Sequence, residues 1–198
     1  MTMPKTLLEL AGADLTPVKM RDACLILIDM QNEYLDGPIA VAGAQEAVAE
    51  AAKLLQAARE GEAPIFHIAH KGKAGSLFDR DAVRGQIIEA VAPQPGEGIV
   101  EKQLPNAFAA TELGDMVAKT ARTNIVLCGF MTHMCVSSTA RAALDLGYRT
   151  TIVEAACGTR DLPDRDGGVI PAATIHSVAM TELSDRFAVI ARDASALM

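Results

Sequence analysis

Cys135 has the sequence context of a catalytic nucleophile. It follows an apolar run at residues 124–129 and a short turn that begins at Gly129, and it opens a stretch with helical spacing at residues 134–146. Unpaired main-chain N–H groups and the helix dipole at such a position favour the reactive thiolate. The same N–H groups can hold an oxyanion formed from a substrate carbonyl. The alternative is a small buried helix residue, which is the common use of a free cysteine.

Two charged residues also stand where predicted strands end. Asp29 closes the apolar run at residues 23–28, so partial burial is expected to raise its pKa and make it a base for a thiol proton. Lys102 ends the predicted strand at residues 98–102, and its charge can pair with Asp29 and favour a thiolate. Taken singly, Asp29 is equally well explained as a loop acid or helix cap, and Lys102 as a surface lysine.

The remaining cysteines have less suggestive positions. Cys24 and Cys128 lie inside apolar strand-like runs and are predicted to belong to the core, whereas Cys157 lies at a strand end and can border a pocket. The chain shows no other mark of export, so free thiols are expected rather than two disulfides.

Short apolar runs alternate with amphipathic stretches along the chain, a pattern typical of βαβ units and a parallel sheet. We predict one α/β domain, doubly wound, with a six-stranded, mainly parallel sheet and helices on both faces. In such a sheet, ligands bind beyond the carboxyl ends of the strands. The predicted strands are residues 23–29, 64–69, 98–102, 124–129, 150–155 and 187–191, and the predicted helices are 43–59, 79–91, 111–121, 134–146 and 171–183.

Composition excludes several classes of function. The net charge of −7 lacks the basic character of a nucleic-acid binder. The longest apolar run, residues 23–28, is too short to span a bilayer. The N-terminus has no apolar segment typical of a signal peptide, so a cytoplasmic location without membrane contact is expected. No G-x-G-x-x-G follows the first strand, so no dinucleotide cofactor is expected.

Three segments resemble the signature blocks of the isochorismatase-like cysteine hydrolases: residues 27–32, 101–108 and 128–136. The resemblance extends roughly from residue 23 to residue 191. It implies a Rossmann-like hydrolase domain at residues 23–198 after an N-terminal extension at 1–22. The family often forms homodimers or homotetramers, and the same is expected here.

The resemblance also implies roles for individual residues. Cys135 becomes the nucleophile, Asp29 the general base and Lys102 the cation that stabilises the charged forms. A cis peptide bond is implied between Phe130 and Met131, and the main-chain N–H groups of Met131 and Cys135 become the oxyanion hole.

The nicotinamidase branch of this family carries a metal site that the present sequence does not reproduce. Its expected Asp is replaced by Ile68, and His67 and His70 stand three residues apart on a strand, where they point to opposite faces. We therefore predict no metal and no cofactor. A core or pocket role is expected for His67, whereas His176, inside a helix, is expected at the surface or an interface.

The sequence thus predicts a hydrolase that cleaves a small-molecule amide or carbamoyl C–N bond through a thioester. Two alternatives remain: a vinyl-ether hydrolase of the isochorismatase type that uses Asp29 without the thiol, and a non-enzymatic redox-sensing or binding protein. True isochorismatases lack this cysteine, which favours the amidase. The expected substrate contacts are Tyr34, His70, Phe108, His133 and Met134.

Overall fold

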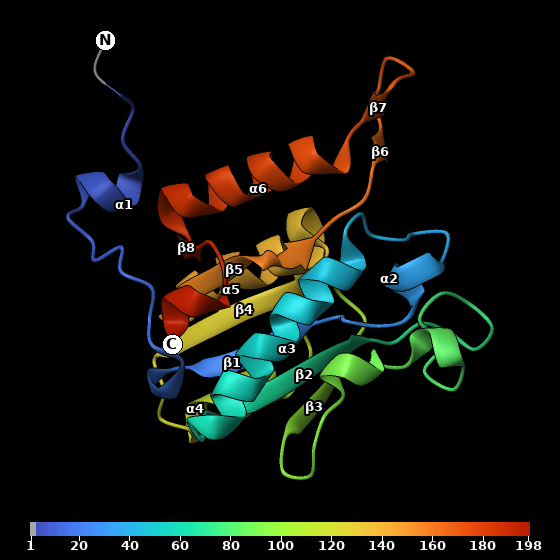
Figure 1. Ribbon diagram of the computed structural model, residues 1–198, viewed down its shortest axis with the longest axis horizontal. Helices are drawn as coiled ribbons and strands as arrows, with labels where there is room; N and C mark the ends of the chain where they lie inside the picture. The colour runs from blue at the N-terminus through green and yellow to red at the C-terminus, as the bar shows by residue number, and fades with distance from the viewer. Residues whose placement is uncertain (1–2) are drawn as a thin grey trace.

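A computed structural model of the protein describes residues 3–198 and contains a six-stranded sheet (Figure 1). The strand order is β3-β2-β1-β4-β5-β8, and every neighbouring pair is parallel. The predicted doubly wound α/β fold is therefore confirmed. The strands are β1 Cys24–Ile28, β2 Ile65–His70, β3 Gly98–Lys102, β4 Asn124–Phe130, β5 Arg149–Gly158 and β8 Val189–Ala191.

The central strand β1, and β4 after its first residue Asn124, are apolar because helices cover both faces of the sheet. All five residues of β1 are buried. At the carboxyl ends the two strands approach so closely that a Cβ on Gly129 would lie 2.0 Å from the carbonyl oxygen of Ile28. Gly129 also has φ of +121°. Only glycine fits this position, which lies directly beside Asp29.

Helices pack against both faces of the sheet (Figure 1). The long helix α3 crosses one face and buries a stripe of alanine and leucine side chains, while α5 lies on the opposite face with α6 beside it. The N-terminal helix α1 is tied to α6 by a bond from the Leu7 N–H to Asp185 Oδ1 (2.8 Å). The helices are α1 Leu7–Leu10, α2 Glu33–Asp36, α3 Ala44–Glu60, α4 Leu113–Lys119, α5 Ser137–Asp145 and α6 Ala172–Arg186.

The helix predicted at residues 79–91 is wrong. This segment contains two single 3₁₀ turns, Val83–Gly85 and Glu89–Val91. Its main chain bonds to the chain that follows β1: Asn32 N–H donates to Gln86 O, and Ile88 N–H donates to Met30 O. These long-range bonds replace the local i to i−4 pattern, and they bring the segment to the edge of the sheet where the site lies.

Two smaller features were not predicted from the sequence. The helix predicted at 134–146 begins with a π-helical turn, Thr132–Val136, before α5. A two-stranded hairpin, β6 Leu162–Pro163 with β7 Val169–Ile170, projects between β5 and α6 (Figure 1). Short 3₁₀ turns also occur at Met20–Asp22 and Ala194–Leu197. Among the helices of residues 3–198, none is long and apolar enough to cross a membrane.

Candidate active site

The carboxyl ends of three strands bring Asp29, Lys102 and Cys135 together. Asp29 directly follows β1, Lys102 ends β3, and Cys135 lies in the π-turn that follows β4. Lys102 Nζ lies 2.6 Å from Asp29 Oδ2 and 3.3 Å from Cys135 Sγ. All three residues are at least 96% buried, with exposed fractions of 0%, 1% and 4%. Residues more than 100 positions apart in the chain thus form one buried cluster.

Lys102 contacts one further group, the imidazole of His70, whose Nδ1 lies 3.4 Å from Nζ. An ammonium group has three hydrogens, and Lys102 has three acceptors: Asp29 Oδ2, Cys135 Sγ and His70 Nδ1. Burial, followed by the charge of Lys102, lowers the pKa of His70. His70 is therefore neutral, accepts at Nδ1 and carries its hydrogen on Nε2.

Asp29 is held as a desolvated base. Its backbone is left-handed, with φ of +50°, and its carbonyl accepts from the Gln31 N–H. Burial raises the pKa of the Asp29 carboxyl, although the charge of Lys102 opposes that shift. Hydrogen bonds from Lys102 and from the Cys135 side chain also oppose the shift, so the carboxylate lies within reach of the thiol proton.

Cys135 is a thiol at rest. Burial and then the negative charge of Asp29 raise its pKa to about 12, and the charge of Lys102 only partly offsets this. Burial and the neighbouring carboxylate thus act against the thiolate that a position before a helix favours. The Val136 and Met134 N–H groups both donate to Met131 O, which fixes the shape of this turn.

The peptide bond between Phe130 and Met131 is cis, as the resemblance implies. The Met131 N–H has no main-chain or side-chain acceptor among the residues that the structure describes. It is therefore available to a substrate oxygen. An oxyanion hole formed by Met131 and Cys135 stays a prediction.

Aromatic side chains form one wall of the site. The Tyr34 ring lies 5.2 Å from that of Phe78 and 5.5 Å from that of Phe130, and the His70 ring lies 5.0 Å from that of Phe78. Burial, together with the negative charge of Asp29, holds the pKa of Tyr34 well above its usual range, so it is a neutral phenol. Phe78 has a left-handed φ of +60°, which has no signal in the sequence.

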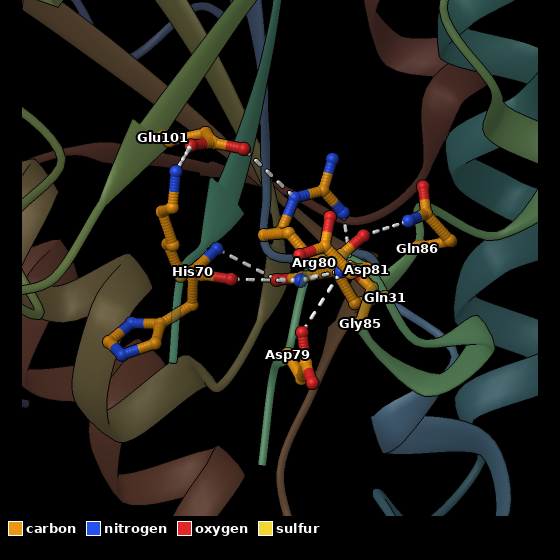
Figure 2. A network of polar contacts seen from close by, with 9 residues as sticks. Gln31, His70, Asp79, Arg80, Asp81, Gly85, Gln86 and Glu101 are labelled. Atoms are coloured by element: carbon orange, nitrogen blue, oxygen red, sulfur yellow. Dashed lines mark hydrogen bonds and ion pairs between the residues drawn. The ribbon is translucent and has the colours of Figure 1, made fainter. Parts of the chain in front are cut away.

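Gln31 fastens this wall to the strand ends (Figure 2). Its side chain, which is fully buried, accepts from the His70 N–H (2.8 Å) and donates to the carbonyls of His70 (3.0 Å) and Gly85 (2.7 Å). Figure 2 also shows Arg80 bonded to the Gly85 carbonyl and paired with Glu101 of β3. No role was predicted for Gln31, although it belongs to one of the three segments that resemble the family.

The other predicted substrate contacts lie in different surroundings. Phe108 stacks on Tyr148, with ring centroids 5.9 Å apart. Tyr148 lies just before the amino end of β5, whereas Asp29, Lys102 and Cys135 lie at the carboxyl ends of their strands. His133 is half-buried and bonded through Nδ1 to Thr159 Oγ1 (2.7 Å), and Met134 is 41% exposed. Phe108 thus packs against Tyr148, whereas His133 and Met134 flank Cys135 in the same turn.

His67 and His70 face different partners. His67 Nε2 lies 2.8 Å from Glu97 Oε2, whereas His70 faces Lys102. Within residues 3–198, no group of three or more His, Cys, Asp or Glu side chains is placed to hold a metal ion. All four cysteines are free and buried.

The chain was compared with known proteins. Residues 23–195 match the family model of the isochorismatase domain. An isochorismatase crystal structure from Pseudomonas putida KT2440 superposes with a TM-score of 0.94 at 45% identity, covering 99% of this chain and 100% of that one.

Two curated relatives bear on the chemistry. The secreted isochorismatase effector Isc1 of Verticillium dahliae is 33% identical over 90% of this chain and 92% of its own. The maleamate amidohydrolase of Pseudomonas putida is 31% identical over 71% of this chain and 74% of its own. With the domain match, these similarities show that the chain belongs to the isochorismatase family.

Proposed function

We propose that the protein is a cysteine amidohydrolase that cleaves a small amide or carbamoyl C–N bond through a thioester. The observation that carries the proposal is the position of Lys102 Nζ, 2.6 Å from Asp29 and 3.3 Å from the Cys135 sulfur. A base, a cation and a nucleophile are thereby placed in contact without solvent. The similarity to maleamate amidohydrolase supports the same class of bond.

In the first half of the reaction, Asp29 takes the proton of the Cys135 thiol and the sulfur attacks the substrate carbonyl. The new S–C bond leaves charge on the carbonyl oxygen, which the Met131 and Cys135 N–H groups can stabilise. Asp29 then returns its proton to the nitrogen as the C–N bond breaks. Ammonia or an amine leaves, and a thioester remains on Cys135.

In the second half, Asp29 accepts a proton from water, whose oxygen attacks the thioester carbonyl. The C–S bond breaks, and the thiol regains its proton from Asp29. Lys102 stays charged throughout. It stabilises the carboxylate of Asp29 when Cys135 is protonated, and the sulfur when the thiolate forms.

The test is ammonia release across a panel of small primary amides and N-carbamoyl compounds, with mass spectrometry of the protein during turnover. The wild type should release ammonia and carry an acyl adduct, and Cys135→Ala should do neither. Cys24→Ala, at the amino end of β1, is the matched control and should retain activity. Turnover or an adduct in Cys135→Ala would overturn the proposal, and wild-type activity on a vinyl ether alone would favour the thiol-independent alternative.

A further inference from the structure

His176 does not lie free on the surface of α6. Only 22% of its side chain is exposed, and its Nδ1 lies 2.9 Å from Oγ1 of Thr132. Thr132 is fully buried and directly follows Met131. It is also the first residue of the π-turn that carries Cys135. A helix residue 41 positions after the nucleophile therefore touches the turn that holds it.

The direction of this hydrogen bond follows from the second partner of Thr132. Thr132 Oγ1 lies 3.0 Å from the carbonyl oxygen of Gly158, which can only accept. A hydroxyl group has one hydrogen, so Thr132 donates to Gly158 and accepts from His176 Nδ1–H. His176 Nε2 faces Glu154, with 3.8 Å between Nε2 and Oε1. Both the Nδ1–H neutral ring and the imidazolium supply the required donor.

These bonds tie the start of the π-turn to α6 on one side and to the end of β5 on the other. The fixed point lies one residue after Met131 and three before Cys135, the two residues whose N–H groups are the predicted oxyanion donors. Main-chain bonds within the turn run from Met134 and Val136 to Met131 O, so they do not anchor it to the rest of the protein. The anchors outside the turn are the sheet, the Thr132 side chain and the bond between His133 Nδ1 and Thr159 Oγ1 (2.7 Å).

We propose that His176 is a positioning residue that acts through Thr132 to hold the oxyanion-binding turn in register with the triad. The inference rests on the proposed amidase function for its kinetic consequence. A displaced N–H group stabilises the tetrahedral intermediate less well but leaves the ground-state substrate little affected. Loss of the bond should therefore lower kcat and leave KM nearly unchanged.

The variants are His176→Ala and Thr132→Val, which each remove the bond, and His176→Asn and Thr132→Ser, which keep a donor or a hydroxyl at the same place. The asparagine amide nitrogen takes a position near that of Nδ1. Val178→Ala, an exposed change on the same helix, is the control. Removing the bond should lower kcat about tenfold with less than a twofold change in KM, because a lost hydrogen bond is worth about one factor of ten.

Three results together would support the proposal. The variants His176→Asn and Thr132→Ser should keep a kcat near that of the wild type, and the double variant Thr132→Val/His176→Ala should have a kcat no lower than that of the slower single variant. The rate of Cys135 alkylation should stay close to the wild-type rate. An equal decrease of kcat in His176→Asn and His176→Ala would show that His176 acts only through packing, and it would overturn the proposal. Additive decreases of kcat in the double variant would overturn it as well.

Hydrogen exchange of the amides at residues 131–136, measured without substrate, separates this inference from the proposed function. Exchange should become faster in His176→Ala and Thr132→Val and stay unchanged in His176→Asn and Val178→Ala. If the wild type hydrolyses no amide yet exchange responds in this way, the amidase proposal fails and the positioning role stands. Unchanged exchange in His176→Ala overturns the positioning role, whatever the substrate.

Discussion

Lys102 Nζ and Asp29 Oδ2 form a 2.6 Å ion pair in which both side chains are completely buried. A buried pair of this kind is a poor source of stability, because desolvation of two charges offsets much of their attraction. The pair instead places charged groups beside the Cys135 sulfur, where they affect the pKa of the thiol. The charge of Lys102 opposes the burial that raises the pKa of the Asp29 carboxyl, and the charge of Asp29 raises the pKa of the Cys135 thiol.

Asp29→Asn should separate thiol reactivity from turnover. Because the negative charge of Asp29 raises the pKa of Cys135, its removal should lower that pKa and speed alkylation by iodoacetamide at pH 8. Amide hydrolysis should fall by at least about 10²-fold, since the proton has no base to accept it. Slower alkylation in Asp29→Asn would contradict the electrostatic account, and mass spectrometry of modified peptides distinguishes Cys135 from the other cysteines.

Lys102→Met should remove the base of the site. Burial raises the pKa of the Asp29 carboxyl, and the lysine charge is the largest effect that opposes this shift, so Asp29 should become protonated once Lys102 is gone. We expect loss of hydrolysis and a decrease of about 3 kcal/mol in the free energy of unfolding. Lys71→Met, at an exposed ion pair, is the control.

Gln31→Met should destabilise the wall of the site. The substitution keeps the volume but removes three buried hydrogen bonds, which leaves the His70 N–H and two carbonyl groups without this partner. The free energy of unfolding should fall by about 2–3 kcal/mol. Urea unfolding measures this, and Gln56→Met on the exposed side of α3 should change stability by less than about 0.5 kcal/mol. Equal effects of the two substitutions would refute a special role for Gln31.

Protonation of Glu97 should lower the free energy of unfolding at acid pH. Burial alone would raise its pKa, but hydrogen bonds from Arg59, the Gln94 N–H and His67 outweigh this and lower it to about 2. The contribution of ionised Glu97 to the free energy of unfolding is therefore present above its usual pKa near 4.5 and is lost as the pH falls toward 2. A shift of that size corresponds to about 3 kcal/mol.

Glu97→Gln tests this contribution. The variant should be less stable than the wild type at pH 7, and the difference should narrow between pH 4.5 and 2. Chemical unfolding of both proteins at each pH gives the difference, in which the titration of the other carboxyl groups cancels. A difference that is constant with pH would contradict the assignment.

Several predictions await experiments of other kinds. The oxyanion hole, the substrate contacts, the homo-oligomer, the boundary after residue 22 and the absence of a metal or cofactor all stay predictions. So does the cytoplasmic location, and one relative is named a secreted effector.

The sequence by itself predicted the parallel sheet from local signals, which are short apolar runs separated by helical stretches. It also placed Asp29, Lys102 and Cys135 where those runs end, whereas their roles as base, cation and nucleophile are predictions from the resemblance to the isochorismatase-like cysteine hydrolases. Asp29, Lys102 and Cys135 each follow such a run, and the carboxyl ends of parallel strands share one edge of a sheet.

Only the tertiary structure decided how the site is surrounded. The segment at 79–91 has an apolar spacing that suits a helix, yet with long-range bonds to Met30 and Asn32 it forms only two separate 3₁₀ turns. The roles of Gln31 and Phe78, and the contact between His176 and Thr132, come from chain segments far apart in sequence. No local pattern encodes such pairings. The resting thiol of Cys135 has the same origin, because its pKa depends on burial and on a carboxylate 106 positions away.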